Sequence, residues 1–178
     1  MREYSCRFGS VPARFYAPDA PGGSWYPSPF MDPIEANQPE LDRALGTLEQ
    51  TLDVVERDGF TRDRTIVWGF SQGACLLSQW MISRAPQIAG AILHTGGYLG
   101  PRTQDPGGLF PTKTQIIMRS IQQDPFVPAR RVLETRDALR GMGARVDCRV
   151  DPGNEHIITN EAIQASASLV LEVRPMSD

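Results

Sequence analysis

A chain of 178 residues with 40% hydrophobic content can bury one sizeable core, which predicts a single domain over residues 1–178. A net charge of -3 provides no basic surface for a phosphate backbone, so we exclude nucleic acid as a main partner. Residues 1–7 lack the apolar core of a signal peptide and no apolar run could cross a bilayer, so we expect a cytoplasmic protein with no membrane partner.

The N-terminal part predicts one short strand and one long loop. Residues 14–17 are aromatic and strand-like, and Pro18 ends them. Residues 19–39 are rich in proline and glycine, and a loop of this length inside a compact domain is uncommon unless it has a function. Two interpretations of its aromatic residues stay open, a lining of a substrate pocket or a cover over the core: Trp25, Tyr26 and Phe30.

The central part predicts helices that alternate with strands. Leucines recur every three or four residues after Pro39, which indicates a helix that ends at Gly59 and turns one apolar stripe toward a sheet. Residues 65–68 form a β-branched strand, and a helix follows from residue 72 to about residue 84. Residues 89–93 are almost continuously apolar, which is typical of a strand covered on both faces.

The C-terminal part continues this alternation. We expect a loop over residues 100–113, a strand at 115–118, a helix at 128–140, a strand at 144–150 and a last helix at about 160–173. This order predicts the α/β class, a mostly parallel sheet with helices on both faces. The three cysteines are an odd number without metal-ligand spacing, which favours reduced thiols in a reducing compartment: Cys6, Cys75 and Cys148.

A serine stands between two glycines where the 65–68 strand meets the next helix. Residues 69–73 read Gly-Phe-Ser-Gln-Gly and match G-x-S-x-G, in which a tight turn lifts the serine hydroxyl above the sheet edge. We expect both Gly69 and Gly73 to allow close passage of the backbone. The pattern alone is weakly specific, but the strand before it and the helix after it make Ser71 a candidate nucleophile.

Two histidines compete for the role of general base. Both follow predicted strands, where ligands bind in open α/β sheets. His156 lies in the loop before the last helix and can reach over a nucleophile on a turn, so we favour His156 as base and expect His94 to be structural.

Asp124 is the favoured partner for that base. It lies in the loop after the 115–118 strand, whereas Asp105 is farther from a strand end and Asp151 begins a Pro-Gly turn. The alternative is that Asp124 only forms an Asp-Pro turn. Ser71, Asp124 and His156 occur in the chain order of α/β-hydrolases.

These motifs, with residues 17–22 and Trp25-Tyr26, resemble the phospholipase/carboxylesterase family of α/β-hydrolases, relatives of acyl-protein thioesterases. The similarity spans the chain from about residue 13. It implies hydrolysis of esters or thioesters through an acyl-enzyme without a cofactor. It also implies Ser71 as nucleophile, His156 as base, Asp124 as its orienting carboxylate, and the backbone N–H of Gln72 as one oxyanion donor.

The sequence departs from this family at its start. Family members begin with an apolar strand that ends in His-Gly, whose following loop supplies a second oxyanion N–H, and nothing like it precedes Arg14. Either the chain is a shortened form or the pair Gly22-Gly23 replaces the donor. Loss of one donor costs about 10²–10³ in kcat. Loss of a central strand also exposes a sheet edge that can recruit a second copy.

The leading functional hypothesis is a serine esterase that hydrolyses small to medium acyl esters. Its acyl pocket would be shaped by the three loop aromatics and by Leu109 and Phe110. The alternative is a weak or inert hydrolase-like module that binds or oligomerises. A thiol hydrolase based on Cys75 is disfavoured because Cys75 lies one helical turn beyond the nucleophile, and a zinc site is disfavoured because the two histidines lack ligand spacing.

Overall fold

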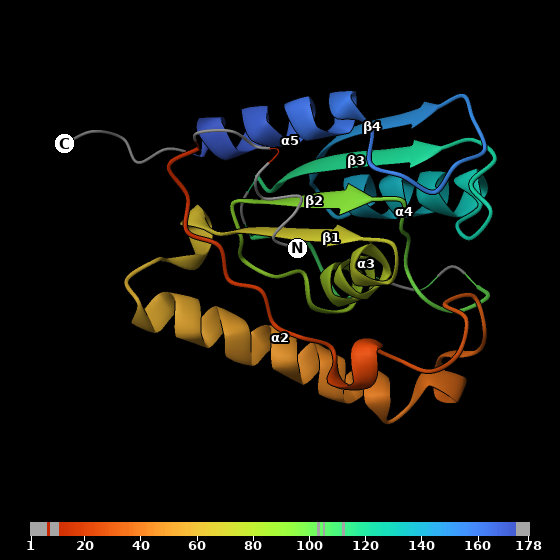
Figure 1. Cartoon of the computed structure of the whole chain (residues 1–178). Helices are drawn as coiled ribbons and strands as arrows, with labels where there is room; N and C mark the ends of the chain where they lie inside the picture. The colour runs from red at the N-terminus through yellow and green to blue at the C-terminus, as the bar shows by residue number, and fades with distance from the viewer. Residues whose placement is uncertain (1–6, 8–10, 103, 105, 112, 174–178) are drawn as a thin grey trace.

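The computed structural model describes residues 7, 11–102, 104, 106–111 and 113–173. Its centre is a four-stranded sheet between layers of helices (Figure 1). Every neighbouring pair of strands is parallel, in the order β1-β2-β3-β4. All carboxyl ends therefore lie at one edge, as the α/β prediction requires. The strands are β1 (Ile66–Phe70), β2 (Gly90–His94), β3 (Gln115–Ile121) and β4 (Arg145–Asp151).

In the part of the chain that the structure describes, the helices α2 to α5 surround this sheet. The helices α3 and α4 pack on one face and α5 packs on the other, while α2 lies outside α3 (Figure 1). Nine consecutive residues of α3 are buried, because this helix is enclosed between the sheet and α2. The helices are α2 (Glu40–Arg57), α3 (Gln72–Arg84), α4 (Ala129–Gly141) and α5 (Asn160–Glu172).

The predicted helices agree with these bounds to within about two residues, and β3 continues three residues beyond its predicted end. The contact of α2 was predicted incorrectly. Its apolar stripe packs chiefly on α3 rather than on the sheet, and Leu41 and Ala44 share a cluster with Cys75 and Leu76. Periodicity identifies an apolar face but does not identify the element that covers it.

The strand predicted at residues 14–17 is wrong. This stretch has no regular structure, and the Tyr16 hydroxyl donates to Asp58 Oδ2 over 2.6 Å while its ring meets Phe60 edge-on. The segment is therefore anchored beside the end of α2 instead of joining the sheet. Among the described strands, β1 has a paired neighbour on one side, β2. The loop at 19–39 is present and contains two short 3-10 turns, Pro21–Gly23 and Ile34–Asn37.

Of the cysteines, Cys75 is buried, Cys148 is half-buried and both are free thiols. Cys6 lies outside the described residues, as does Asp105. Within the described ranges, no helix is both long and apolar enough to span a membrane.

Candidate active site

Ser71 lies in the turn between β1 and α3 and has a strained backbone. Its φ of 53° and ψ of -122° are costly for a residue with a Cβ, and such strain concentrates at functional turns. The Ser71 N–H donates to the carbonyl of His94 over 3.0 Å, and the Ser71 carbonyl accepts from the N–H of Cys75 over 2.9 Å. One bond extends the sheet ladder and the other begins the helix, so the turn is held from both sides.

Two glycines let α3 approach the strands closely, but they are not the pair expected from the motif. A Cβ on Gly69 would lie 2.6 Å from the backbone of Gly73 and Ala74, and a Cβ on Gly96 would lie 2.4 Å from the Cβ of Ala74. A Cβ on Gly73 would meet nothing within 4 Å. The prediction is therefore correct for Gly69 and wrong for Gly73. Gly73 stands in the first turn of α3 and faces open space.

Asp124 divides its two carboxylate oxygens between two tasks. Oδ1 accepts the backbone N–H groups of Phe126 and Val127, both at 2.9 Å. This is the turn-forming role that the sequence left open. Oδ2 lies 2.7 Å from Nδ1 of His156, and the Asp124 side chain is completely buried. Because a carboxylate accepts and does not donate, the proton of a neutral His156 ring lies on Nδ1, and the lone pair then lies on Nε2.

The loop that carries His156 is tied to the loop that carries Asp124. The N–H of Gln122 donates to the backbone carbonyl of Asp151 over 2.8 Å, and the N–H of Gln123 donates to the backbone carbonyl of Gly153 over 3.0 Å. At the other end of the His156 loop, the Thr159 side chain accepts the N–H of Ala162 and caps α5. Such a cap contributes about 1 kcal/mol and determines where the helix begins.

Two phenylalanine rings enclose the imidazole of His156. The ring of Phe70 lies 4.8 Å away in a tilted arrangement, and the ring of Phe126 lies 5.0 Å away edge-on. Only 16% of the His156 side chain stays exposed. Phe70 is the last residue of β1 and directly precedes Ser71, so the imidazole packs against the strand end that leads to the nucleophile candidate. The sequence offered no signal for either ring.

His94 is buried and bonded on both ring nitrogens. Trp68 Nε1 donates to His94 Nδ1 over 3.3 Å, and His94 Nε2 lies 3.1 Å from the hydroxyl of Ser166 on α5. Burial, together with the nearby Arg119 and Arg7, lowers the pKa of His94 to about 4. These contacts support the structural role expected for His94, whose carbonyl also holds Ser71.

We expect His94 to make the free energy of unfolding depend on pH. Its pKa is 6.5 in an unfolded chain and about 4 when folded, so the unfolded state binds the extra proton first. Stability is complete above pH 6.5 and falls by about 3 kcal/mol as the pH drops to about 4. Urea unfolding at pH 7 and pH 4 should show a larger loss for the wild type than for His94→Gln. Equal losses in the two chains would contradict this assignment.

Gln72 opens α3 directly after Ser71. The first N–H groups of a helix have no partner inside the helix, so the Gln72 N–H is available to a ligand at this turn. Gly23 is a less favourable replacement donor, and so is the nearby Trp25, because both N–H groups already have acceptors. The N–H of Gly23 donates to Ala20 within its own turn over 2.9 Å, and the N–H of Trp25 donates to Gln72 Oε1 over 2.9 Å.

The three aromatic residues proposed for substrate pack against the core to different degrees. Tyr26 is 3% exposed and belongs to the cluster that includes Leu41 and Leu99. Trp25 and Phe30 are partly buried against the same cluster. Covering the core is therefore a role of all three, and Tyr26 has little surface left for a substrate.

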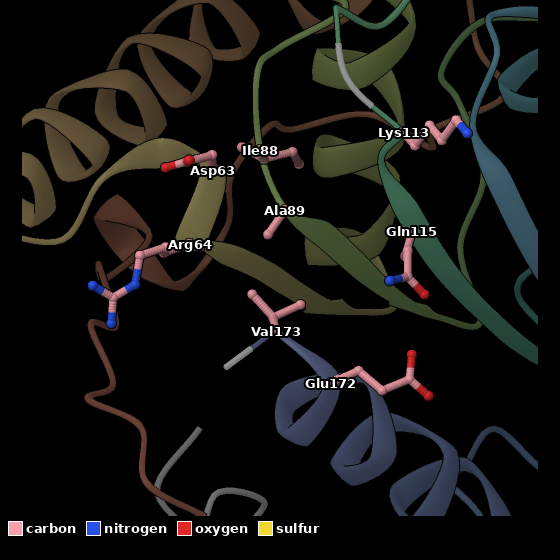
Figure 2. Close-up of a pocket in the computed structure, with 8 residues that line it drawn as sticks. All are labelled: Asp63, Arg64, Ile88, Ala89, Lys113, Gln115, Glu172 and Val173. Carbon is pink, nitrogen blue, oxygen red and sulfur yellow. The ribbon is translucent and has the colours of Figure 1, made fainter. Parts of the chain in front are cut away.

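Leu109 and Phe110 lie at the wrong end of the sheet for an acyl pocket. The N–H of Phe110 donates to the carbonyl of Met142, just after α4 and next to the start of β4. A cavity of about 260 Å³ lies at the same edge of the sheet, where the strands begin. The side chains of Arg64 and Lys113 at its rim extend away from the cavity (Figure 2). Its other lining residues are Asp63, Ile88, Ala89, Gln115, Glu172 and Val173.

Arg131 is a buried residue of the region that the sequence did not single out. Its Nη1 donates to the carbonyls of Tyr98 and Gly100, at 2.9 and 2.6 Å, and its guanidinium lies over the Tyr98 ring at 4.3 Å. It therefore holds the loop after β2.

Cys75 is 1% exposed, and burial raises the pKa of its thiol to about 11, which argues against a thiolate nucleophile.

Comparisons with known proteins identify the family and the fold. The sequence profile of the family described as Phospholipase/Carboxylesterase matches residues 12–171. A crystal structure of a phospholipase/carboxylesterase from Dyadobacter fermentans DSM 18053 is 36% identical with a TM-score of 0.82, over 88% of this chain and 75% of that one. Arabidopsis thaliana SOBER1 is 19% identical with a TM-score of 0.77, over 96% and 90%, which supports the fold alone.

A curated relative is more distant in sequence. Acyl-protein thioesterase 1 of Schizosaccharomyces pombe is 25% identical over 148 residues, which are 80% of this chain. The chain spans 65% of the length of that relative.

Proposed function

Because the chain belongs to the phospholipase/carboxylesterase family of α/β-hydrolases, we propose that it is a serine carboxylesterase that hydrolyses small to medium acyl esters or thioesters. The observation that carries the proposal is the 2.7 Å contact between His156 Nδ1 and Asp124 Oδ2, with the His156 ring packed against Phe70, the residue before Ser71. This contact leaves Nε2 of His156 able to accept a proton from a hydroxyl.

In the proposed reaction Ser71 Oγ attacks the carbonyl carbon of the ester while His156 Nε2 takes the hydroxyl proton. Asp124 accepts from Nδ1 and stabilises the imidazolium. The negative charge that develops on the carbonyl oxygen is stabilised by the N–H of Gln72. His156 then returns the proton to the leaving alcohol or thiol, and a water molecule hydrolyses the acyl-enzyme by the same route.

A fluorophosphonate probe tests the nucleophile directly. We expect the wild-type chain to be labelled at Ser71 and the Ser71→Ala variant to lose the label, because the probe bonds to an activated serine oxygen. Mass spectrometry of the tryptic peptide locates the adduct. A matched control is Ser168→Ala, an exposed serine on α5, which should be labelled like the wild type. Equal labelling of the wild type and Ser71→Ala would remove the proposal.

The second candidate function is a weakly active or inert hydrolase-like module that binds or oligomerises. It is favoured by the commitment of the Gly23 and Trp25 N–H groups to other acceptors, which leaves the second oxyanion donor unassigned. Aryl-ester turnover combined with sizing chromatography separates the two functions. Robust turnover supports the esterase, and a folded oligomer without turnover supports the module.

A further inference from the structure

The side chain of Gln72 connects the nucleophile turn to the long N-terminal loop. Its Oε1 accepts the N–H of Trp25 over 2.9 Å. Its Nε2 donates to the carbonyl of Tyr26 over 2.9 Å and to the hydroxyl of Ser24 over 3.0 Å. One carboxamide therefore holds three consecutive residues that lie 46 to 48 positions earlier in the chain.

The two backbone bonds determine the orientation of the carboxamide. A backbone N–H faces Oε1 and a backbone carbonyl faces Nε2, so exchanging the amide oxygen and nitrogen would set donor against donor and acceptor against acceptor. A glutamate at this position could accept from Trp25 but would bring a carboxylate oxygen against the carbonyl of Tyr26. The site is therefore built for an uncharged amide.

The segment that Gln72 holds has one buried end and one exposed end. Tyr26 is anchored in the core cluster, Trp25 is partly buried and Ser24 is exposed. Ser71 is itself partly exposed and directly precedes Gln72. The exposed part of the segment is thus fixed relative to the nucleophile by a side chain only one residue away from it.

We propose that Gln72 is a positioning residue, which holds Ser24 and Trp25 as one wall of the substrate site and so determines which ester groups reach Ser71. This inference rests on the proposed esterase function. It assigns to the Gln72 side chain a task separate from that of its backbone N–H, because the helix presents the N–H whatever side chain stands at this position.

Hydrolysis of p-nitrophenyl acetate and p-nitrophenyl octanoate by the wild type and by Gln72→Met tests the proposal. Methionine keeps the length of the side chain and removes all three bonds. We expect kcat/KM for octanoate to fall at least about fivefold more than for acetate, since a long acyl group needs the wall and an acetyl group does not. The loss should appear mainly as a higher KM for octanoate, the signature of a lost binding contact.

Three further variants sharpen the test. Gln72→Glu should change the selectivity more than Gln72→Met, because it adds repulsion at the Tyr26 carbonyl. Ser24→Ala removes one of the three bonds and should have a smaller effect in the same direction. Gln164→Met, at an exposed glutamine on α5, should leave both substrates unchanged. In hydrogen exchange, the amide of Trp25 should exchange faster in Gln72→Met than in the wild type.

The outcomes distinguish a failure of the esterase function from a failure of the positioning role alone. A wild type that hydrolyses neither ester would overturn the esterase proposal and this inference with it. An active wild type whose ratio of octanoate to acetate kcat/KM is unchanged in Gln72→Met would overturn the positioning role alone. Equal losses for both esters would also overturn it, because they would indicate general support of the turn rather than a wall.

Discussion

Replacing Asp124 by asparagine is expected to lower kcat for ester hydrolysis by about 10³–10⁴-fold. Asparagine can keep an acceptor for the N–H groups of Phe126 and Val127, so the turn should survive. The atom facing Nδ1 of His156 becomes an amide that donates, which shifts the imidazole proton to Nε2. An Nε2 that already carries a proton cannot take one from Ser71.

Steady-state kinetics with an aryl ester measures this effect, and circular dichroism with urea unfolding checks that the variant folds. Asp137→Asn is the matched control, because Asp137 is an exposed carboxylate on α4 that pairs with Arg136. It should retain wild-type kinetics. A folded Asp124→Asn chain with less than a tenfold loss in kcat would show that Asp124 only forms the turn.

Replacing Gly69 by alanine is expected to lower the free energy of unfolding by about 3 kcal/mol or more. The new Cβ would lie 2.6 Å from backbone atoms of Gly73 and Ala74, which cannot move without displacing α3 from the sheet. Gly73→Ala should be neutral or stabilising by up to about 1 kcal/mol, because its Cβ meets open space and alanine favours the helix.

Urea unfolding of the two variants compares the glycines of one motif directly. A Gly69→Ala chain that fails to fold agrees with the prediction. A Gly69→Ala chain within about 1 kcal/mol of the wild type would show that α3 can move, and the tight approach of the helix to the strand would not be essential.

The motif predicts equal roles for both glycines, and the difference between them arises from the tertiary contacts of each one. The five-residue pattern records where a serine can stand at a strand-helix turn. It does not record which neighbour each glycine faces. Gly96 lies outside the motif, yet a Cβ on Gly96 would lie closer to Ala74, at 2.4 Å, than a Cβ on Gly69 would, at 2.6 Å.

Only one of the two roles of Asp124 can be predicted from adjacent residues. The Asp-Pro turn and a link to His156 were alternatives at the level of sequence, and the structure gives one oxygen to each. A turn is local and can be read from adjacent residues. The contact with His156 spans 32 residues and depends on the bonds that tie two loops together.

Periodicity and chain order by themselves determined the alternation of helices and strands, the parallel sheet and the candidate residues Ser71, Asp124 and His156. These features follow from apolar spacing and from the rule that chemistry gathers at the carboxyl ends of parallel strands, and both are properties of the chain order.

Only the tertiary structure decided what each apolar face and each loop touches. In the structure α2 packs against α3, and residues 14–17 do not join the sheet. Leu109 and Phe110 lie at the edge where the strands begin, and the side chain of Gln72 contacts Ser24–Tyr26. These contacts join residues far apart in the chain. They depend on how whole elements pack together, and no short stretch of sequence encodes that packing.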